Sequence, residues 1–166
     1  MKISPTFVIL LILMQLSCKS PEEKIREQKI KDSITTIVID RIGDDMVKSK
    51  FTNNEVKKSP IKIIYCKFIP HEYSQNKDVE MGYKNVSKKN IVAAKFMWYG
   101  ENVFGDAADM GISTGYGGGT MEAVLKPGEE SATVWNIYSR DGKTIIGSRP
   151  EEVVFEDGTK WKLSQY

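Results

Sequence analysis

The chain has 166 residues but only two cysteines and one histidine. Zinc sites typically need clustered Cys and His ligands, so this composition argues against one. His71 lies five residues after Cys66, so on a continuous strand the two side chains would point to opposite faces. A Cys-His catalytic pair is therefore disfavoured. We expect a noncatalytic protein that has no metal and no cofactor.

An excess of charge of either sign is also missing. The formal net charge is +2, and removing residues 1–17 would take away one basic residue, Lys2, and no acidic residue. No basic patch indicates a nucleic-acid partner. The glycine-dense segment 111–120 lacks the Lys and following Ser or Thr of a phosphate-binding loop.

Long hydrophobic runs are absent except at the N-terminus. The run Phe7–Leu16 is far shorter than the roughly 20 residues that cross a bilayer, so a permanent transmembrane helix is not expected. Lys2, this run and the small residue Ser17 form a secretory signal that ends at Cys18. The junction resembles a bacterial lipoprotein signal of the looser, Bacteroidota-like kind, with Gln15 where Leu is usual. It implies acylation of Cys18 and a lipid anchor in the cell envelope, at the outer membrane; the alternative is a plain secreted or membrane-anchored protein.

Residues 18–59 differ in composition from the rest of the chain. Pro21, followed by two acidic residues, favours a helix start, and Ile30, Ile34, Val38 and Ile42 recur every four residues. We predict a helix from Pro21 to Ile42 that ends near Gly43, although the β-branched residues 33–39 favour a strand. This segment is expected to be a tether, with a helix that packs on a partner as the alternative.

From residue 60 onward the hydrophobic pattern changes to a period of two. Val79, Met81 and Tyr83 share one face, and Phe96 and Trp98 share another. Five further strands are expected, with Pro-Gly and Asp-Gly turns between some of them. About seven short strands predict an antiparallel β-sandwich over residues 60–166. The other expected strands are 61–69, 120–125, 131–138, 153–156 and 160–163.

Two segments carry a family resemblance. Residues 79–104, read as VEMGYKNVSKKNIVAAKFMWYGENVF, and residues 125–135, read as LKPGEESATVW, resemble the immunoglobulin-like domains of the FxLYD and DUF5780 groups of bacterial surface proteins. The FxLYD tetrapeptide itself is absent, and so is the Cys-Trp-Cys framework of antibody domains. The resemblance implies an immunoglobulin-like sandwich in an envelope setting and supplies no catalytic residues.

A candidate binding loop spans Gly105–Gly119. Asn102, Asp106 and Asp109 could present oxygen ligands to calcium, but their spacing differs from that of an EF-hand, and a solvated loop is the alternative. Tyr116 amid glycines is the only large aromatic residue of the loop, so it is the candidate contact.

We therefore expect a lipid-anchored domain that mediates binding to an unknown protein or glycan. The alternatives are a carbohydrate-binding module with exposed aromatic residues and, more remotely, a metal-assisted hydrolase built around His71.

Overall fold

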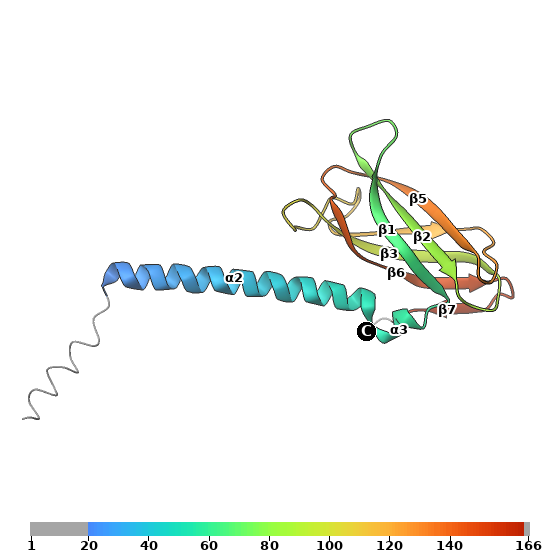
Figure 1. The fold of residues 1–166 in the computed structure, drawn as a ribbon, viewed down its shortest axis with the longest axis horizontal. Helices are drawn as coiled ribbons and strands as arrows, with labels where there is room; N and C mark the ends of the chain where they lie inside the picture. Colours follow the sequence, from blue (N-terminus) through green and yellow to red (C-terminus); the bar gives the residue numbers. More distant parts are fainter. Residues whose placement is uncertain (1–19, 165–166) are drawn as a thin grey trace, which may run out of the picture. The chain divides into compact units, whose positions relative to one another are not determined.

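The computed structural model describes residues 20–164, so the expected signal segment and Cys18 lie outside the described residues. The chain divides into two compact units, Met1–Asp44 and Asp45–Tyr166. Within residues 20–164, two helices precede seven strands (Figure 1). No helix within residues 20–164 is both long and apolar enough to cross a membrane.

Helix α2 (Pro21–Thr52) begins at a reciprocal capping box. The amide of Glu23 donates to Ser20 Oγ at 3.2 Å, while the Ser20 amide donates to the Glu23 carboxylate at 3.1 Å. The helix runs on through Gly43, so the expected end at that residue is wrong. An interior glycine costs a helix only about 1 kcal/mol, and the good helix formers Met46, Lys48 and Lys50 follow it.

The expected apolar stripe of α2 is only partly described. Ile30 and Ile34 are exposed within the first unit. The side chains of Val38 and Ile42 lie outside the described residues.

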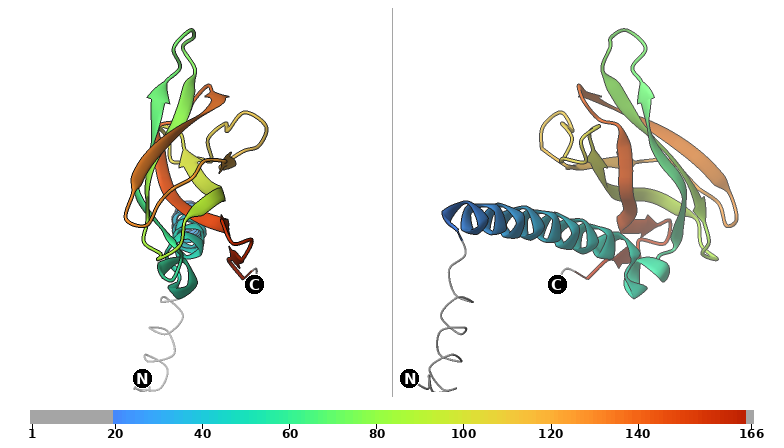
Figure 2. Two further views of the ribbon diagram at one scale, coloured as in Figure 1. Left: turned by 90° about the vertical axis from the view of Figure 1, so that its right-hand side faces the viewer. Right: turned by 60° about the vertical axis from the view of Figure 1, so that its left-hand side comes forward.

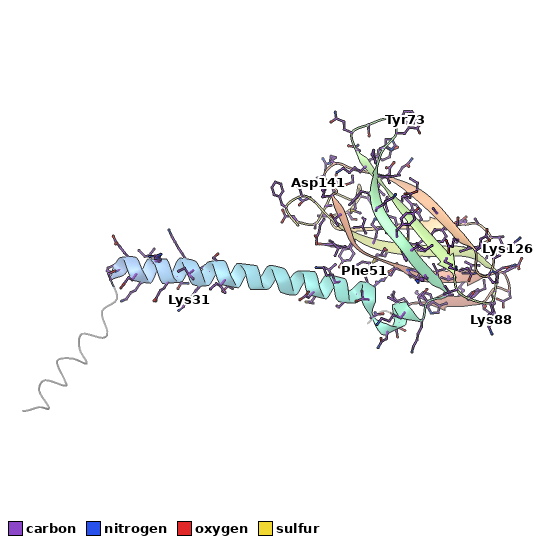
Figure 3. All side chains as sticks on the ribbon, viewed as in Figure 1. Lys31, Phe51, Tyr73, Lys88, Lys126 and Asp141 are labelled. Carbon is purple, nitrogen blue, oxygen red and sulfur yellow. The ribbon has the colours of Figure 1, made fainter. Side chains whose placement is uncertain are left out.

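The last turn of α2 belongs to the second unit through Phe51, which is labelled in Figure 3. Phe51 is only 5% exposed, and the Arg149 guanidinium lies 5.3 Å from the centre of its ring. A side chain at Gly147 would collide with this ring, because its Cβ would lie 2.6 Å from it. Helix α3 (Asn54–Lys57) follows, with Asn53 as its N-cap.

The seven strands form a sandwich of two antiparallel sheets, as the sequence predicts. One sheet has the order β1-β2-β5 and the other β4-β3-β6-β7 (Figure 2). These orders correspond to strands A-B-E and C-F-G of an immunoglobulin-type sandwich, with the fourth strand placed beside the third. The strands are β1 (Ile61–Pro70), β2 (Lys77–Asn85), β3 (Ile91–Glu101), β4 (Tyr116–Met121), β5 (Glu130–Ser139), β6 (Thr144–Phe155) and β7 (Lys160–Lys162).

The core lies between the sheets and contains the faces that alternation predicts. Val79, Met81 and Tyr83 of β2 are buried, and so are Phe96 and Trp98 of β3. The Tyr83 and Phe96 rings meet across the two sheets, with their centres 5.1 Å apart. Period-two hydrophobicity was therefore a sufficient signal for the central strands, because one face of each is buried.

Strand β4 lies four residues earlier than the sequence predicts. Its glycines permit close packing of two indole rings: a Cβ at Gly117 would lie 2.4 Å from Trp98 Nε1, and one at Gly119 would lie 2.3 Å from Trp135 Nε1. The glycine-dense segment is therefore in part a core strand, and the expected loop is shorter. Hydrophobic periodicity missed its first half because Gly117 and Gly119 contribute backbone and no side chain where the indole rings pack.

Strand β6 starts at Thr144, well before the predicted start at Val153. Pro150 lies inside it, at a point where the register with β3 shifts between Lys95 and Phe96. Proline cannot donate to a sheet ladder, and it is tolerated at such a bulge. The proline and Gly147 hide this half of the strand from a period-two search.

The packing of β4 can be tested with Gly119→Ala. We expect a loss of about 1 to 3 kcal/mol in the free energy of unfolding, because the added methyl collides with the Trp135 indole. Urea denaturation of the full chain, followed by tryptophan fluorescence, measures this. Thr120→Ala, an exposed change on the same strand, should cost at most about 0.5 kcal/mol. Equal losses in the two variants would contradict the assignment.

Candidate functional site

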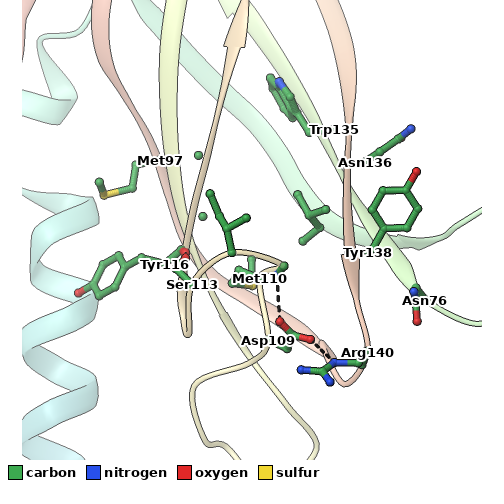
Figure 4. Close-up of a pocket in the computed structure, with 15 residues that line it drawn as sticks. Asn76, Met97, Asp109, Met110, Ser113, Tyr116, Trp135, Asn136, Tyr138 and Arg140 are labelled. Carbon is green, nitrogen blue, oxygen red and sulfur yellow. Dashed lines mark hydrogen bonds and ion pairs between the residues drawn. The ribbon is translucent and has the colours of Figure 1, made fainter.

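The two sheets leave an opening on one side, because β4 and β5 are both edge strands. A cleft of about 780 Å³, here called the edge cleft, lies along these two strands and the loop 109–113 (Figure 4). Its walls are mainly apolar, as in most small-molecule sites. The apolar side chains that line it are those of Met97, Met110, Ile112, Tyr116, Trp135 and Ile137.

Two polar bridges join the strands and loops around the edge cleft. Trp135 Nε1 donates to the Thr120 carbonyl at 3.0 Å, which links β5 to β4. Asp109 forms an ion pair with Arg140, drawn as a dashed line in Figure 4. The cleft is thus an apolar surface flanked by two fixed hydrogen bonds, which orient its walls without filling it.

The loop beside the cleft is held against β5 by a close backbone approach. Gly111 has φ +87°, and a Cβ there would lie 2.3 Å from the Ile137 carbonyl oxygen. Only glycine suits this position on both counts. The Asp109 amide also donates to Asp141 Oδ1 at 2.8 Å. Ile112 stands fully exposed at the tip of this anchored loop.

Of the expected binding residues, Asn102 forms a turn. Its Oδ1 accepts hydrogen bonds from the amides of Phe104 and Asp106, at 2.9 and 3.1 Å. This is an Asx-type turn, in which the side chain supports the local backbone. Asp106 is exposed, and neither residue lines the edge cleft.

Asp109 does line the edge cleft, but both of its carboxylate oxygens are engaged. Oδ1 accepts from the Gly111 amide at 2.9 Å, and Oδ2 accepts from Arg140. The hydrogen bond from Arg140, followed by that from Gly111, holds the pKa of Asp109 below its ordinary value. The described residues include no group of three or more His, Cys, Asp or Glu side chains placed to hold a metal.

Tyr116 lies at the start of β4 and lines the cleft from the side opposite Arg140 (Figure 4). Its ring packs edge-on against Tyr99 with the centres 4.8 Å apart, and Lys50 Nζ lies 5.7 Å from its centre. Tyr116 is therefore half-buried and packed on the sandwich, as well as accessible from the cleft.

A second depression lies on the outer face of the three-stranded sheet. It has a volume of about 410 Å³ and is called the His71 hollow here. It shares Asn136 and Tyr138 with the edge cleft, so the two sites meet at the end of β5. The residues that line it are Ile69, Pro70, His71, Glu72, Tyr73, Asp78, Val134, Asn136 and Tyr138.

The buried carboxylate of Asp78 organises this hollow. Oδ1 accepts hydrogen bonds from the amides of Ile137 and Tyr138 at 3.1 and 3.4 Å. Oδ2 lies 2.6 Å from His71 Nδ1, and the two side chains are 5% and 9% exposed, respectively. Because the carboxylate acts as an acceptor, Nδ1 carries the proton, and the other ring nitrogen, Nε2, is left for a further partner.

Tyr138 has an unusual backbone that the same carboxylate supports. Its φ is +54°, the only positive value at a non-glycine position among the described residues. The register between β2 and β5 shifts here, since Lys77 pairs with Ser139 but Val79 pairs with Trp135. Asp78 alone therefore lies opposite residues 136–138, and its carboxylate replaces sheet hydrogen bonds that this bulge removes.

Cys66 lies within β1, away from both sites. Burial raises the pKa of its thiol to about 12, although a hydrogen bond with Ser148 acts in the opposite direction. A thiol with so high a pKa is poorly nucleophilic at neutral pH. Cys66 therefore acts as a small packing residue rather than as a nucleophile.

Sequence reasoning missed most of the residues that form the two sites. Met110, Ile137 and Arg140 belong to no recognised motif, and Trp135 shares a strand face with Thr133 and Ile137, which does not by itself show whether that face is buried. Figure 4 shows Trp135 on one side of β5, with Asn136 and Tyr138 on the other. His71 and Asp78 had a usable signal, because they lie at the facing ends of two successive predicted strands, one at 61–69 and one that begins near Val79.

No family model matches the chain, and no curated protein matches it. Among solved structures, the chain is similar to a hypothetical protein from Peptoclostridium difficile 630, with 12% identity and a TM-score of 0.47; the match covers 64% of this chain and 87% of that one. A target of the Northeast Structural Genomics Consortium matches with 12% identity and a TM-score of 0.34, over 61% of this chain and 79% of that one.

The backbone at Tyr138 can be tested with a pair of substitutions. Tyr138→Gly should be more stable than Tyr138→Ala by about 1 kcal/mol, because alanine keeps a Cβ at positive φ and glycine does not. Both variants lose the same ring. Urea denaturation of each full chain measures the difference.

The matched control is the same pair at Val134, an exposed residue on β5 that is not among the positive-φ positions. There the order should reverse, with alanine more stable than glycine by about 0.5 to 1 kcal/mol. The same order at both positions would refute the strained backbone.

Proposed function

We propose that this protein is a noncatalytic binding domain held at the bacterial envelope by a lipid on Cys18. Its kinship with the immunoglobulin-like FxLYD and DUF5780 domains is part of the same proposal. The binding role is inferred from the edge cleft, which has a volume of about 780 Å³ and mainly apolar walls and lies between two edge strands. The lipid anchor rests on the sequence of residues 1–18 alone.

The chemistry of the edge cleft favours an apolar group as its occupant. Two methionines, Met97 and Met110, line it beside Trp135. Methionine side chains are flexible and polarizable, so they adapt to ligands of varied shape. The charges of Asp109 and Arg140, which line the cleft, balance each other in an ion pair. A charged ligand therefore has little to gain there.

The more remote alternative, a metal-assisted hydrolase, has limited support. His71 shares its hollow with two carboxylates, Asp78 and Glu72. Asp78 is committed to the His71 ring and to two backbone amides. Binding accounts for more of the described geometry than hydrolysis does.

Anchoring can be tested with Cys18→Ser. Since the thioether-linked lipid needs the thiol, this variant should lose incorporation of radiolabelled palmitate and move from the membrane fraction to the soluble one. Cys66→Ser is the matched control and should keep both lipid and membrane association. Labelling that persists in Cys18→Ser would contradict the anchor.

Binding in the edge cleft can be tested with the uncharged apolar dye Nile red. We expect dye fluorescence with the wild-type chain and weaker dye binding, by roughly tenfold, in Ile112→Ser, because about 1.5 to 3 kcal/mol comes from burying such a side chain. Ile64→Ser, an exposed change on β1 away from the cleft, should leave dye binding unaltered. Equal dye binding by the wild type and Ile112→Ser would argue against the cleft as a site.

A further inference from the structure

The His71 hollow has the composition of a site for a neutral, hydroxyl-rich ligand. No lysine or arginine is among its lining residues, so it offers no charge to a phosphate or carboxylate. The negative charge of Asp78 is already satisfied by the His71 ring and by two backbone amides. A ligand can therefore contact an aromatic surface and nearby hydrogen-bond donors and acceptors.

The aromatic surface consists of three rings in succession. The His71 and Tyr138 rings lie 4.6 Å apart between centres, and the Tyr73 ring meets His71 edge-on at 6.2 Å. Tyr138 is 50% exposed and Tyr73, at the tip of the β1–β2 turn in Figure 3, is 83% exposed. Exposed rings with a polar tip are suited to contact a ligand that has an apolar face and a hydroxyl rim.

Polar groups surround these rings. His71 Nε2 accepts a hydrogen bond when the ring is neutral, the Asn136 amide both donates and accepts, and the Glu72 carboxylate accepts. Each matches a hydroxyl group, which can donate and accept at once. Among the described residues, no hydrogen bond to another side chain involves Nε2 of His71 or the Asn136 amide.

The site is also pre-organised. Asp78 holds the His71 ring through Nδ1 and holds the bulge that carries Tyr138 through two amides. A non-glycine residue at φ +54° costs free energy, and such strain is found at sites where geometry matters for function. Rings that are fixed before binding lose less entropy when a ligand arrives.

We propose that the His71 hollow binds a pyranose ring of a glycan. The C–H face of the sugar packs on Tyr138, and its hydroxyls bond to His71 Nε2, Asn136 and Glu72. Asp78 acts as a positioning residue that does not touch the sugar. This site adjoins the edge cleft and shares Asn136 and Tyr138 with it, whereas His71, Glu72 and Tyr73 line the hollow alone.

The test is saturation-transfer difference NMR on the full chain in detergent solution, with four probes: chitohexaose, cellohexaose, maltohexaose and xylohexaose. These separate an N-acetylated sugar, as in cell-wall glycans, from plain glucans and a pentose polymer. We expect transfer to at least one probe, strongest at ring C–H protons. Tyr138→Gly, which suits the positive φ, should raise the dissociation constant at least about tenfold, as the loss of an aromatic hot spot does.

Two variants provide the controls. Tyr138→Phe keeps the ring and should bind within about threefold of the wild type, whereas Phe104→Ala removes an exposed ring outside the hollow and should change nothing. Absence of transfer to all four probes overturns the proposal, and so does unchanged binding in Tyr138→Gly. Tyr73→Ala removes a ring that lines the hollow and not the edge cleft, so it should weaken glycan binding while dye binding in the cleft persists. Failure of this site is therefore distinguishable from failure of the proposed function.

Discussion

The buried carboxylate of Asp78 is the interaction that organises the His71 hollow and the end of β5, where the two candidate sites meet. One side chain accepts hydrogen bonds from two amides of β5 and from the His71 ring. Buried carboxylates are costly unless they are fully bonded, and a bulge leaves backbone amides in need of acceptors. The free amides of the bulge supply the hydrogen bonds that the buried carboxylate needs, and the carboxylate supplies the acceptor that these amides need. The carboxylate thus supports the bulge at the end of β5 in which Tyr138 has its positive φ.

The edge cleft arises from a different constraint, which is how the two sheets close on each other. Trp98 and Trp135 are large, and their rings lie 5.1 Å apart at the side of the core next to β4. The glycines of β4 admit these rings at distances that any Cβ would forbid. The indole of Trp135 then reaches the Thr120 carbonyl and joins the two edge strands. The cleft is the space that remains beyond this bridge.

These constraints explain which predictions succeeded. The central strands β2 and β3 bury one face each, so Val79, Met81 and Tyr83, like Phe96 and Trp98, follow a period of two. Strand β4 and the first half of β6 do not, because glycine and proline replace the side chains on which the pattern depends. The helix continues past Gly43, where one glycine costs only about 1 kcal/mol and good helix formers follow it.

The candidate site was less predictable than the fold. Asp109 and Tyr116 do line the edge cleft, whereas Asn102 supports its own turn and Asp106 lies outside the cleft. Met110, Ile137 and Arg140 carry no motif, and they become neighbours only when a loop closes onto an edge strand. A sequence pattern indicates neighbours within one helix or strand, whereas these residues come from different segments of the chain.

The sequence by itself determined the antiparallel sandwich, its central core faces, and the scarcity of cysteine and histidine. These depend on composition and on local periodicity, which each segment carries alone. The tertiary structure decided that Asp78 meets His71 and Tyr138, and that β4 and β5 face each other across an apolar opening. Those relations depend on strand register and on packing between sheets, because a shift of one residue would turn each side chain to the other face.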